Sequence, residues 1–207
     1  MFLSCISEPE YICIFAMKKL LFVVIFLCVS LFANAQGHLS FKGVPIDGSL
    51  NEYVNKMKQA GFVHLGTQDG TAILSGDFAG FKNCTIGVSA LKSTNLVNTI
   101  VVVFPDSDSW STLEGSYNAL KDMLTQKYGA PAEDVAEFQG YSKPRDDNDK
   151  LHELRMDRCV WYATFRTNLG NIELSLGHQS VRSCFVRLQY WDRTNTDAVR
   201  QQAMDDL

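Results

Sequence analysis

The stretch from Val97 to Pro131 constrains the fold most, because a strand, a helix cap and a helix are signalled there in succession. It opens with a β-branched run, Val97 to Phe104, which predicts a central strand. Pro105 ends that strand, since proline has no N–H to donate to a sheet ladder. The residues that follow offer side-chain oxygens to the free N–H groups of a helix start: Asp106, Asp108, Ser109 and Ser111.

A helix is predicted from Ser111 to Tyr128. Ser111 and Glu114 have the spacing of a capping box, and Gly129 and Pro131 end the helix. Apolar residues at steps of three and four share one face of this helix: Trp110, Leu113, Tyr117, Leu120 and Leu124. We therefore expect the helix to bury that face on a sheet.

The chain before this stretch predicts one helix and a strand meander. Ser49 and Glu52 form a second capping box, and the helix that they open runs to about Ala60. From Phe62 onward the apolar residues alternate with a period of two, as in strands. The predicted strands are Phe62 to Leu65, Thr71 to Phe78 and Phe81 to Leu91. Their short turns favour antiparallel pairing, and the lead-in from Gln36 to Gly48 is predicted to be irregular.

The chain after the central helix follows a similar order. Its predicted strands are Glu133 to Tyr141, Arg158 to Arg166, Asn171 to Leu176 and Val181 to Trp191, with Gly177 to Ser180 as a turn. A loop from Ser142 to Asp149, a short helix from Lys150 to Met156 and a closing helix from about Asn195 complete the pattern. Helices combined with an antiparallel meander predict an α+β fold with the helices packed on the sheet. The element order also predicts two halves, 49–105 and 109–191, each a helix followed by strands.

The first 35 residues predict an export signal. Met17, Lys18 and Lys19 form a basic start, and an apolar run from Leu20 to Ala33 follows it. Small residues then precede Gln36, where we expect cleavage. The apolar run is shorter than the ~20 residues that a membrane-spanning helix requires. We therefore expect a periplasmic or secreted protein with a single domain of residues 36–207.

Residues 1–16 do not fit such a signal, because Glu8 and Glu10 are acidic where a basic segment belongs. We therefore expect translation to start at Met17. Cys28 follows three bulky residues, so we expect no lipid anchor. No transmembrane segment is predicted in the mature chain.

Charge and cysteine usage disfavour two classes of protein. The formal net charge is −4, and acidic and basic residues are interspersed, which disfavours nucleic acid as a partner. The mature part keeps three cysteines, Cys84, Cys159 and Cys184, all inside strand-like runs. Cysteine at such positions packs as a small apolar residue, and an odd, sparse set does not build a disulfide framework.

The sequence contains no catalytic, metal-binding or cofactor-binding motif. A reactive thiol would need a helix start or a neighbouring cation, and the three mature cysteines lie in mid-strand. The sequence lacks the metal-binding patterns HExxH and CxxC, the glycine loop that binds phosphate, and the GxSxG motif of hydrolases. The acidic run from Asp146 to Asp149 lacks the glycine and the final glutamate of a calcium loop, so a solvated loop is predicted. We predict no catalytic residue, no metal and no cofactor.

Aromatic residues are the remaining candidates for a binding site. Two predicted strands that can be neighbours each carry two consecutive aromatic residues: Trp161 and Tyr162, and Tyr190 and Trp191. Consecutive residues of a strand point to opposite sides of the sheet. Some of them can therefore point away from the core, where Trp and Tyr favour recognition. Ordinary core and cross-strand packing is the competing interpretation.

Three stretches carry a resemblance: FKGVPIDGSLNEYVNKMKQAGF, VVFPDSDSWSTLEGSYNALKDMLTQKYGAP and LQYWDRTNTDAVRQQAMDDL. They resemble uncharacterised exported proteins of Bacteroidetes type, and the likeness covers most of the mature chain. The element order is also similar to that of β-lactamase inhibitor protein and small outer-membrane assembly lipoproteins. That topological resemblance implies a binding or assembly role, and it supplies no site residue.

Two functions therefore compete at this stage. The first is a non-catalytic envelope or secreted binding module, whose partner is an unidentified protein or a small envelope ligand. The alternative is an envelope hydrolase whose site combines residues far apart in the sequence, such as Asp or His with one of the cysteines.

Overall fold

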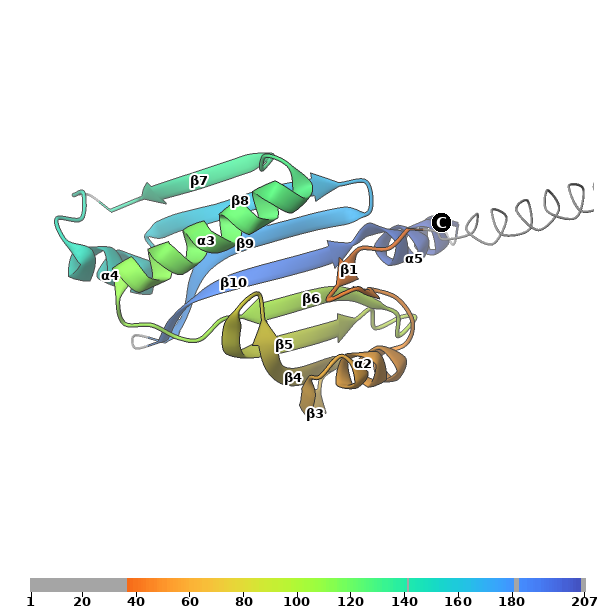
Figure 1. The fold of residues 1–207 in the computed structure, drawn as a ribbon. Coiled ribbons are helices and arrows are strands. Elements are labelled where there is room, and N and C mark those ends of the chain that lie inside the picture. Colours follow the sequence, from red (N-terminus) through yellow and green to blue (C-terminus); the bar gives the residue numbers. More distant parts are fainter. Residues whose placement is uncertain (1–36, 141, 181–182, 206–207) are drawn as a thin grey trace, which may run out of the picture. The chain divides into compact units, whose positions relative to one another are not determined.

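A computed structural model describes residues 37–140, 142–180 and 183–205 (Figure 1). The first half contains β1 (Ser40–Phe41), β2 (Val44–Pro45), α2 (Leu50–Gln59), β3 (Val63–Gln68), β4 (Thr71–Phe78), β5 (Phe81–Ala90) and β6 (Val97–Val103). The second contains α3 (Trp110–Tyr128), β7 (Glu133–Phe138), α4 (Asp147–Arg155), β8 (Cys159–Thr167), β9 (Gly170–Ser180), β10 (Ser183–Asp192) and α5 (Arg193–Asp205). Apart from the β1–β2 hairpin, the strands form one antiparallel sheet in the order β3-β4-β5-β6-β10-β9-β8-β7. The predicted α+β class with an antiparallel sheet is confirmed.

Each half contributes four consecutive strands to this sheet, preceded by one long helix. The last strand of the first half, β6, pairs with the last strand of the second half, β10. Val101 faces Gln189 at the middle of that pairing. Within the sheet, one antiparallel strand pair therefore joins the two halves, while the pseudo-repeat of 49–105 and 109–191 stays a prediction.

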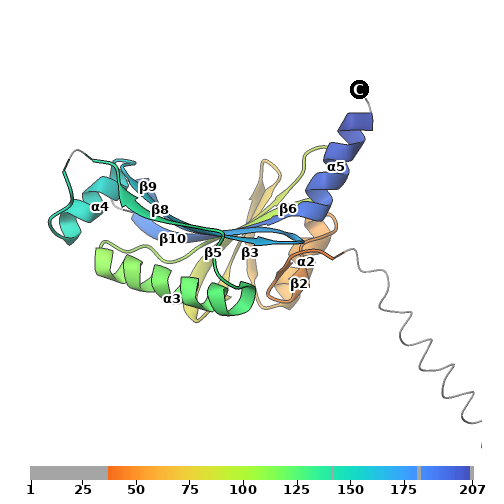
Figure 2. The same ribbon diagram turned by 90° about the horizontal axis from the view of Figure 1, so that it is seen from above.

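The helices α2 and α3 cover one side of the sheet. Figure 2 shows α3 along that side, while α5 leaves the end of the sheet on the other side. All five residues of the predicted α3 stripe are buried, and they join the buried α2 residues in one hydrophobic cluster. The sheet contributes alternate residues to the same cluster: Ala72, Leu74, Ile86, Val88, Ile100, Val102, Leu188, Tyr190, Ile172, Leu174, Ala163 and Phe165.

The two predicted capping boxes have different outcomes. At α2, the Ser49 N–H donates to Glu52 Oε2 (2.9 Å) and the Glu52 N–H donates to Ser49 Oγ (3.4 Å), so the box is confirmed. At α3 the box of Ser111 and Glu114 is wrong. Ser109 caps that helix instead, because the helix begins at Trp110 and Ser111 already lies in its first turn.

Three other local predictions are also corrected. The lead-in is not irregular, since its residues form the small β1–β2 hairpin. Gly177 to Ser180 is not a turn, because the ladder to β10 continues through it and Gly177 pairs with Phe185. The helix α4 begins before Lys150, because Asp146 caps it by accepting the Asp149 N–H at 2.9 Å.

The predicted signal peptide, the start at Met17 and the lipidation question at Cys28 all fall outside the described residues. Within the described part of the chain, no helix has the length and apolar character needed to cross a membrane. Export and localisation therefore stay predictions.

Candidate functional site

The side of the sheet opposite α2 and α3 forms a broad surface, which we call the open face. None of the described helices lies across it (Figure 2). One unbroken row of paired residues crosses all eight strands on this side. In strand order the row is Val63, Ser75, Thr85, Val103, Arg187, Ser175, Tyr162 and Val135. Successive residues of a strand point to opposite sides of the sheet, and on each strand the residues of one alternate set are in the core. The other alternate set, which is mostly polar, forms the open face.

The open face differs between its two halves. On β4, β5 and β6 most of its residues are small or β-branched and uncharged: Thr71, Ile73, Ser75, Thr85, Gly87, Ser89, Thr99, Val101 and Val103. Charge enters this half at the β4–β5 turn, where Asp77 pairs with Lys82. On β7 to β10 it carries two Arg–Glu ion pairs, Arg166 with Glu133 and Arg187 with Glu173 (3.7 Å). One half therefore offers apolar and hydroxyl contacts, and the other offers oriented charges.

Hydrogen bonds orient the charged half. Arg187 Nε donates to Ser175 Oγ at 3.2 Å, which places the arginine stem over a serine that is only 5% exposed. The Tyr162 hydroxyl donates to Glu133 at 3.4 Å, so Glu133 receives both the tyrosine and Arg166. Paired surface charges of this kind contribute little to stability, but they define a directional pattern for a partner to match.

The structure separates the four predicted aromatic residues into two pairs. Trp161 packs in the helix-covered core, with its ring centre 5.1 Å from that of Trp110. Tyr190 is also on that side, 4% exposed, and burial raises the pKa of its hydroxyl. Tyr162 and Trp191 are partly exposed and lie in register with open-face residues, Ser175 and Thr99 respectively. The four residues therefore do not form one cluster: the second pair lies on the open face, whereas Tyr190 is buried and the partly buried Trp161 lies on the helix side.

Sequence reasoning missed the charged residues of the open face. The sequence signal that could have found them is alternation with core residues along each strand. The residues with this signal are Glu133, Arg166, Glu173 and Arg187. Their pairing depends on the order β10-β9-β8-β7, which is a tertiary feature.

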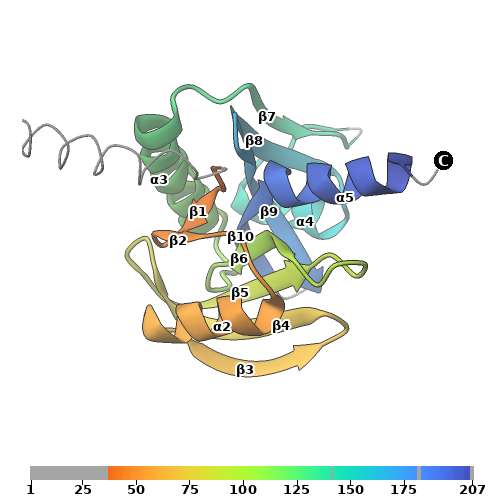
Figure 3. The ribbon, with the colours of Figure 1, turned by 90° about the vertical axis from the view of Figure 1, so that its right-hand side faces the viewer.

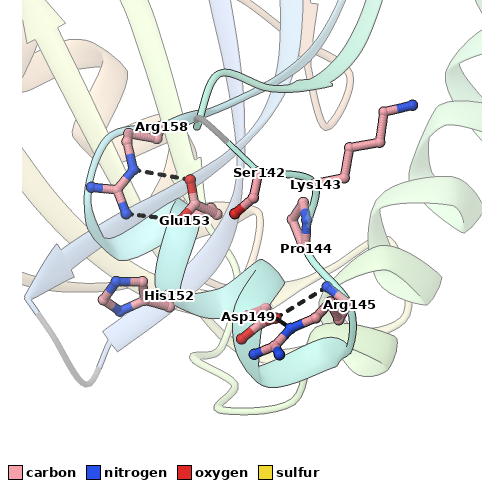
Figure 4. A pocket seen from close by; sticks show the side chains of 8 residues that line it. All are labelled: Ser142, Lys143, Pro144, Arg145, Asp149, His152, Glu153 and Arg158. Atoms are coloured by element: carbon pink, nitrogen blue, oxygen red, sulfur yellow. Dashed lines mark hydrogen bonds and ion pairs between the residues drawn. The ribbon is translucent and has the colours of Figure 1, made fainter.

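A second candidate is a polar pocket of about 430 Å³ between the β7–α4 loop and α4 (Figure 4). Its lining residues are Ser142, Lys143, Pro144, Arg145, Asp149, His152, Glu153 and Arg158. Glu153 accepts both Arg158 Nε (2.9 Å) and Nη2 (2.8 Å), and this pairing lowers the pKa of the Glu153 carboxyl. Asp149 accepts the backbone N–H of Arg145 (3.1 Å) and its Nε (3.0 Å). Four of the pocket's charges thus neutralise one another and hold the loop, which disfavours a site for a charged ligand.

The acidic run beside this pocket serves α4. Asp146 caps the helix and Lys150 pairs with Asp147 at 3.1 Å. Among the residues that the structure describes, no group of three or more His, Cys, Asp or Glu side chains is arranged to hold a metal ion.

None of the three mature cysteines combines an accessible thiol with a lowered pKa. Cys84 and Cys184 are fully buried, and burial raises the pKa of Cys84 and brings the pKa of Cys159 to about 12. His178 pairs in register with Cys184, and its Nε2 lies 3.0 Å from Asp157 Oδ1. This is a Cys, His and Asp alignment of the kind that the hydrolase alternative requires. No hydrogen bond is described between the Cys184 and His178 side chains, and a substrate cannot reach a thiol with no exposed surface.

We expect the native protein to protect two of its thiols. Cys84 and Cys184 are 0% exposed, so a maleimide should label them only after local or global unfolding. Peptide mapping of native and guanidinium-unfolded samples measures this directly, with Cys159 as the partly exposed comparison. Fast native labelling of Cys184 would restore the hydrolase alternative.

Comparison of the chain with protein-family models, curated proteins and solved structures finds no match. The resemblance to exported proteins of Bacteroidetes type therefore stays a prediction.

Proposed function

We propose that the protein is a non-catalytic binding module that holds a folded partner protein on its open face. The observation that carries this proposal is the unbroken row of side chains across all eight strands, with no described helix above it. The opposite side already buries the hydrophobic core beneath α2 and α3. The open face is thus the large surface that the fold leaves free for recognition.

The chemistry of the open face favours a protein over a small molecule. Trp, Tyr and Arg are the residue types that dominate the energetics of protein interfaces, and Trp191, Tyr162 and Arg187 represent all three here. A small molecule prefers a concave, mostly apolar pocket with a few convergent polar groups. A row of side chains on a sheet instead matches another extended surface.

The predicted export signal determines where such a partner would be met. If cleavage occurs before Gln36, the domain acts in the envelope or outside the cell. The partner is then an envelope or extracellular protein, whose contact surface combines an apolar area with charges complementary to the two Arg–Glu pairs.

Removing the two open-face aromatics should weaken capture of the partner by at least about tenfold, because truncated anchors at an interface centre cost the most. The experiment is affinity capture from an envelope fraction by wild type and by a Tyr162→Ala, Trp191→Ala double variant. Arg166→Glu, at a side chain 60% exposed, provides a second open-face variant with little risk to folding.

Met123→Ala is the matched control, because Met123 is 43% exposed and lies on α3, at the other side of the sheet. It should leave capture within about twofold, as neutral interface positions do. Equal recovery of the same partner by wild type and both open-face variants would remove the open face as the binding surface.

A further inference from the structure

The edge strand β3 has the features of a surface that pairs with another strand. It is the first strand of the sheet order, so its outer edge has no neighbour among the described strands (Figure 3). Val63 and Leu65, both on β3, are 62% and 63% exposed, more than any other large apolar side chain described. An edge strand with exposed apolar residues and unpaired backbone groups is a template for strand addition.

The usual protections against pairing are distributed unequally between the two edges. The other edge strand, β7, carries Glu133, Asp134 and Glu137 among its six residues. The six residues of β3, VHLGTQ, include no Asp, Glu, Lys, Arg or Pro. A bulge between His64 and Gly66 is the one protective device on β3, and it leaves Leu65 outside the regular pairs that β3 makes with β4.

We propose that β3 pairs antiparallel with β3 of a second copy of this chain, centred on His64. Antiparallel pairing about residue 64 places Val63 of each copy opposite Leu65 of the other. Both positions fall on the open-face side, since Val63 pairs with Ser75 and the bulged Leu65 lies beside the Gly66–Ile73 pair. Each exposed apolar side chain thus obtains an apolar partner across the strands, which is the self-complementarity that a two-fold interface requires.

Charge explains why β3 rather than β7 is the edge that pairs between copies, and why assembly stops at two. Two β3 strands bring no Asp, Glu, Lys or Arg of these strands together, so no repulsion between such side chains opposes their approach. Two β7 strands would bring six carboxylates together, and like charges across a strand pair are destabilising. The dimer is therefore closed, with one sheet running through both copies and both open faces on the same side.

His64→Cys tests this pairing and its register together. Residues directly opposite one another in an antiparallel pair have Cα atoms ~4.5–5.5 Å apart, which suits a disulfide. The protein is expressed from its full reading frame, purified and mildly oxidised, and the crosslinked peptide is mapped. We expect a covalent dimer through position 64, and none through Gln68→Cys at the other end of β3.

A charge on the edge should break the association. Val63→Lys and Leu65→Lys should each weaken self-association measured by sedimentation at least about tenfold, because edge lysines oppose strand pairing. Met156→Lys replaces another exposed apolar residue, 42% exposed and outside β3, and should leave association unchanged. A wild-type monomer at every concentration, or a dimer that survives both edge variants, would overturn the proposal. Since neither measurement involves the partner protein, failure here is distinct from failure of the proposed function.

Discussion

Trp110→Ala is expected to lower the free energy of unfolding by about 3–5 kcal/mol, the range for truncating a buried Trp or Phe. Trp110 is 1% exposed and begins α3, and its ring centre lies 5.4 Å from that of Phe138 and 5.1 Å from that of Trp161. Its indole N–H donates to Glu114 Oε2 at 3.0 Å. The side chain therefore joins the helix layer to β7 and β8, and removing it leaves a cavity at that junction.

Equilibrium denaturation of wild type and variant measures this loss. Trp110→Phe is the control, because it keeps an aromatic ring and loses mainly the indole N–H and some volume. It should cost clearly less than Trp110→Ala. A loss below about 0.5 kcal/mol for the alanine variant, typical of surface sites, would contradict the packing of α3 on the sheet.

Asp192→Ala is the second substitution for which we expect a large effect, a loss of about 3 kcal/mol of stability. Asp192 is 0% exposed, and its carboxylate accepts the Leu39 N–H at 2.8 Å and the Asn195 N–H at 3.1 Å. His38 Nδ1 lies 3.1 Å from the same carboxylate. The residue ties the lead-in hairpin to the end of β10, and alanine would leave the buried N–H groups of Leu39 and Asn195 without acceptors.

The control for that prediction is Asp47→Ala. Asp47 belongs to the same network but its side chain is 46% exposed, so water can replace its hydrogen bonds. Its loss should stay below about 1 kcal/mol, as for exposed pairs. Equal losses from the two variants would mean that the Asp192 network is not a buried anchor.

The sequence predicted correctly those features that depend on interactions between residues close together in the chain. The Ser49 capping box and the stripe from Leu113 to Leu124 depend on neighbouring turns, and both are present as predicted. The predicted strand from Asn171 to Leu176 is also present, and its alternating residues Ile172 and Leu174 are in the core. These patterns involve residues within a few positions of one another, so the sequence contains them directly.

Long-range pairings were not predictable in the same way. The lead-in hairpin rests on Asp192, 153 residues from Leu39, and a buried aspartate at the end of a strand resembles an ordinary surface residue in sequence. The pairing of β6 with β10 defines the centre of the sheet and has no local signature.

The candidate site likewise combines a feature that the sequence predicts with one that depends on long-range packing. Sequence parity indicated that some of the four late-strand aromatics point away from the core. Which of them do so depends on the side that α3 covers, and that is decided by tertiary packing. Trp191 and Tyr162 are therefore candidates only once the sheet is assembled.

Site-specific photo-crosslinking in living cells tests the central claim, that the open face contacts a protein partner, most directly. A photoreactive residue replaces Thr85 or Thr99 on the open face, or Met123 on α3 as the reference position. We expect one higher-mass adduct, containing the same partner protein, from both open-face positions and none from Met123. Adducts from Met123 alone, or no adduct from either open-face position, would contradict it.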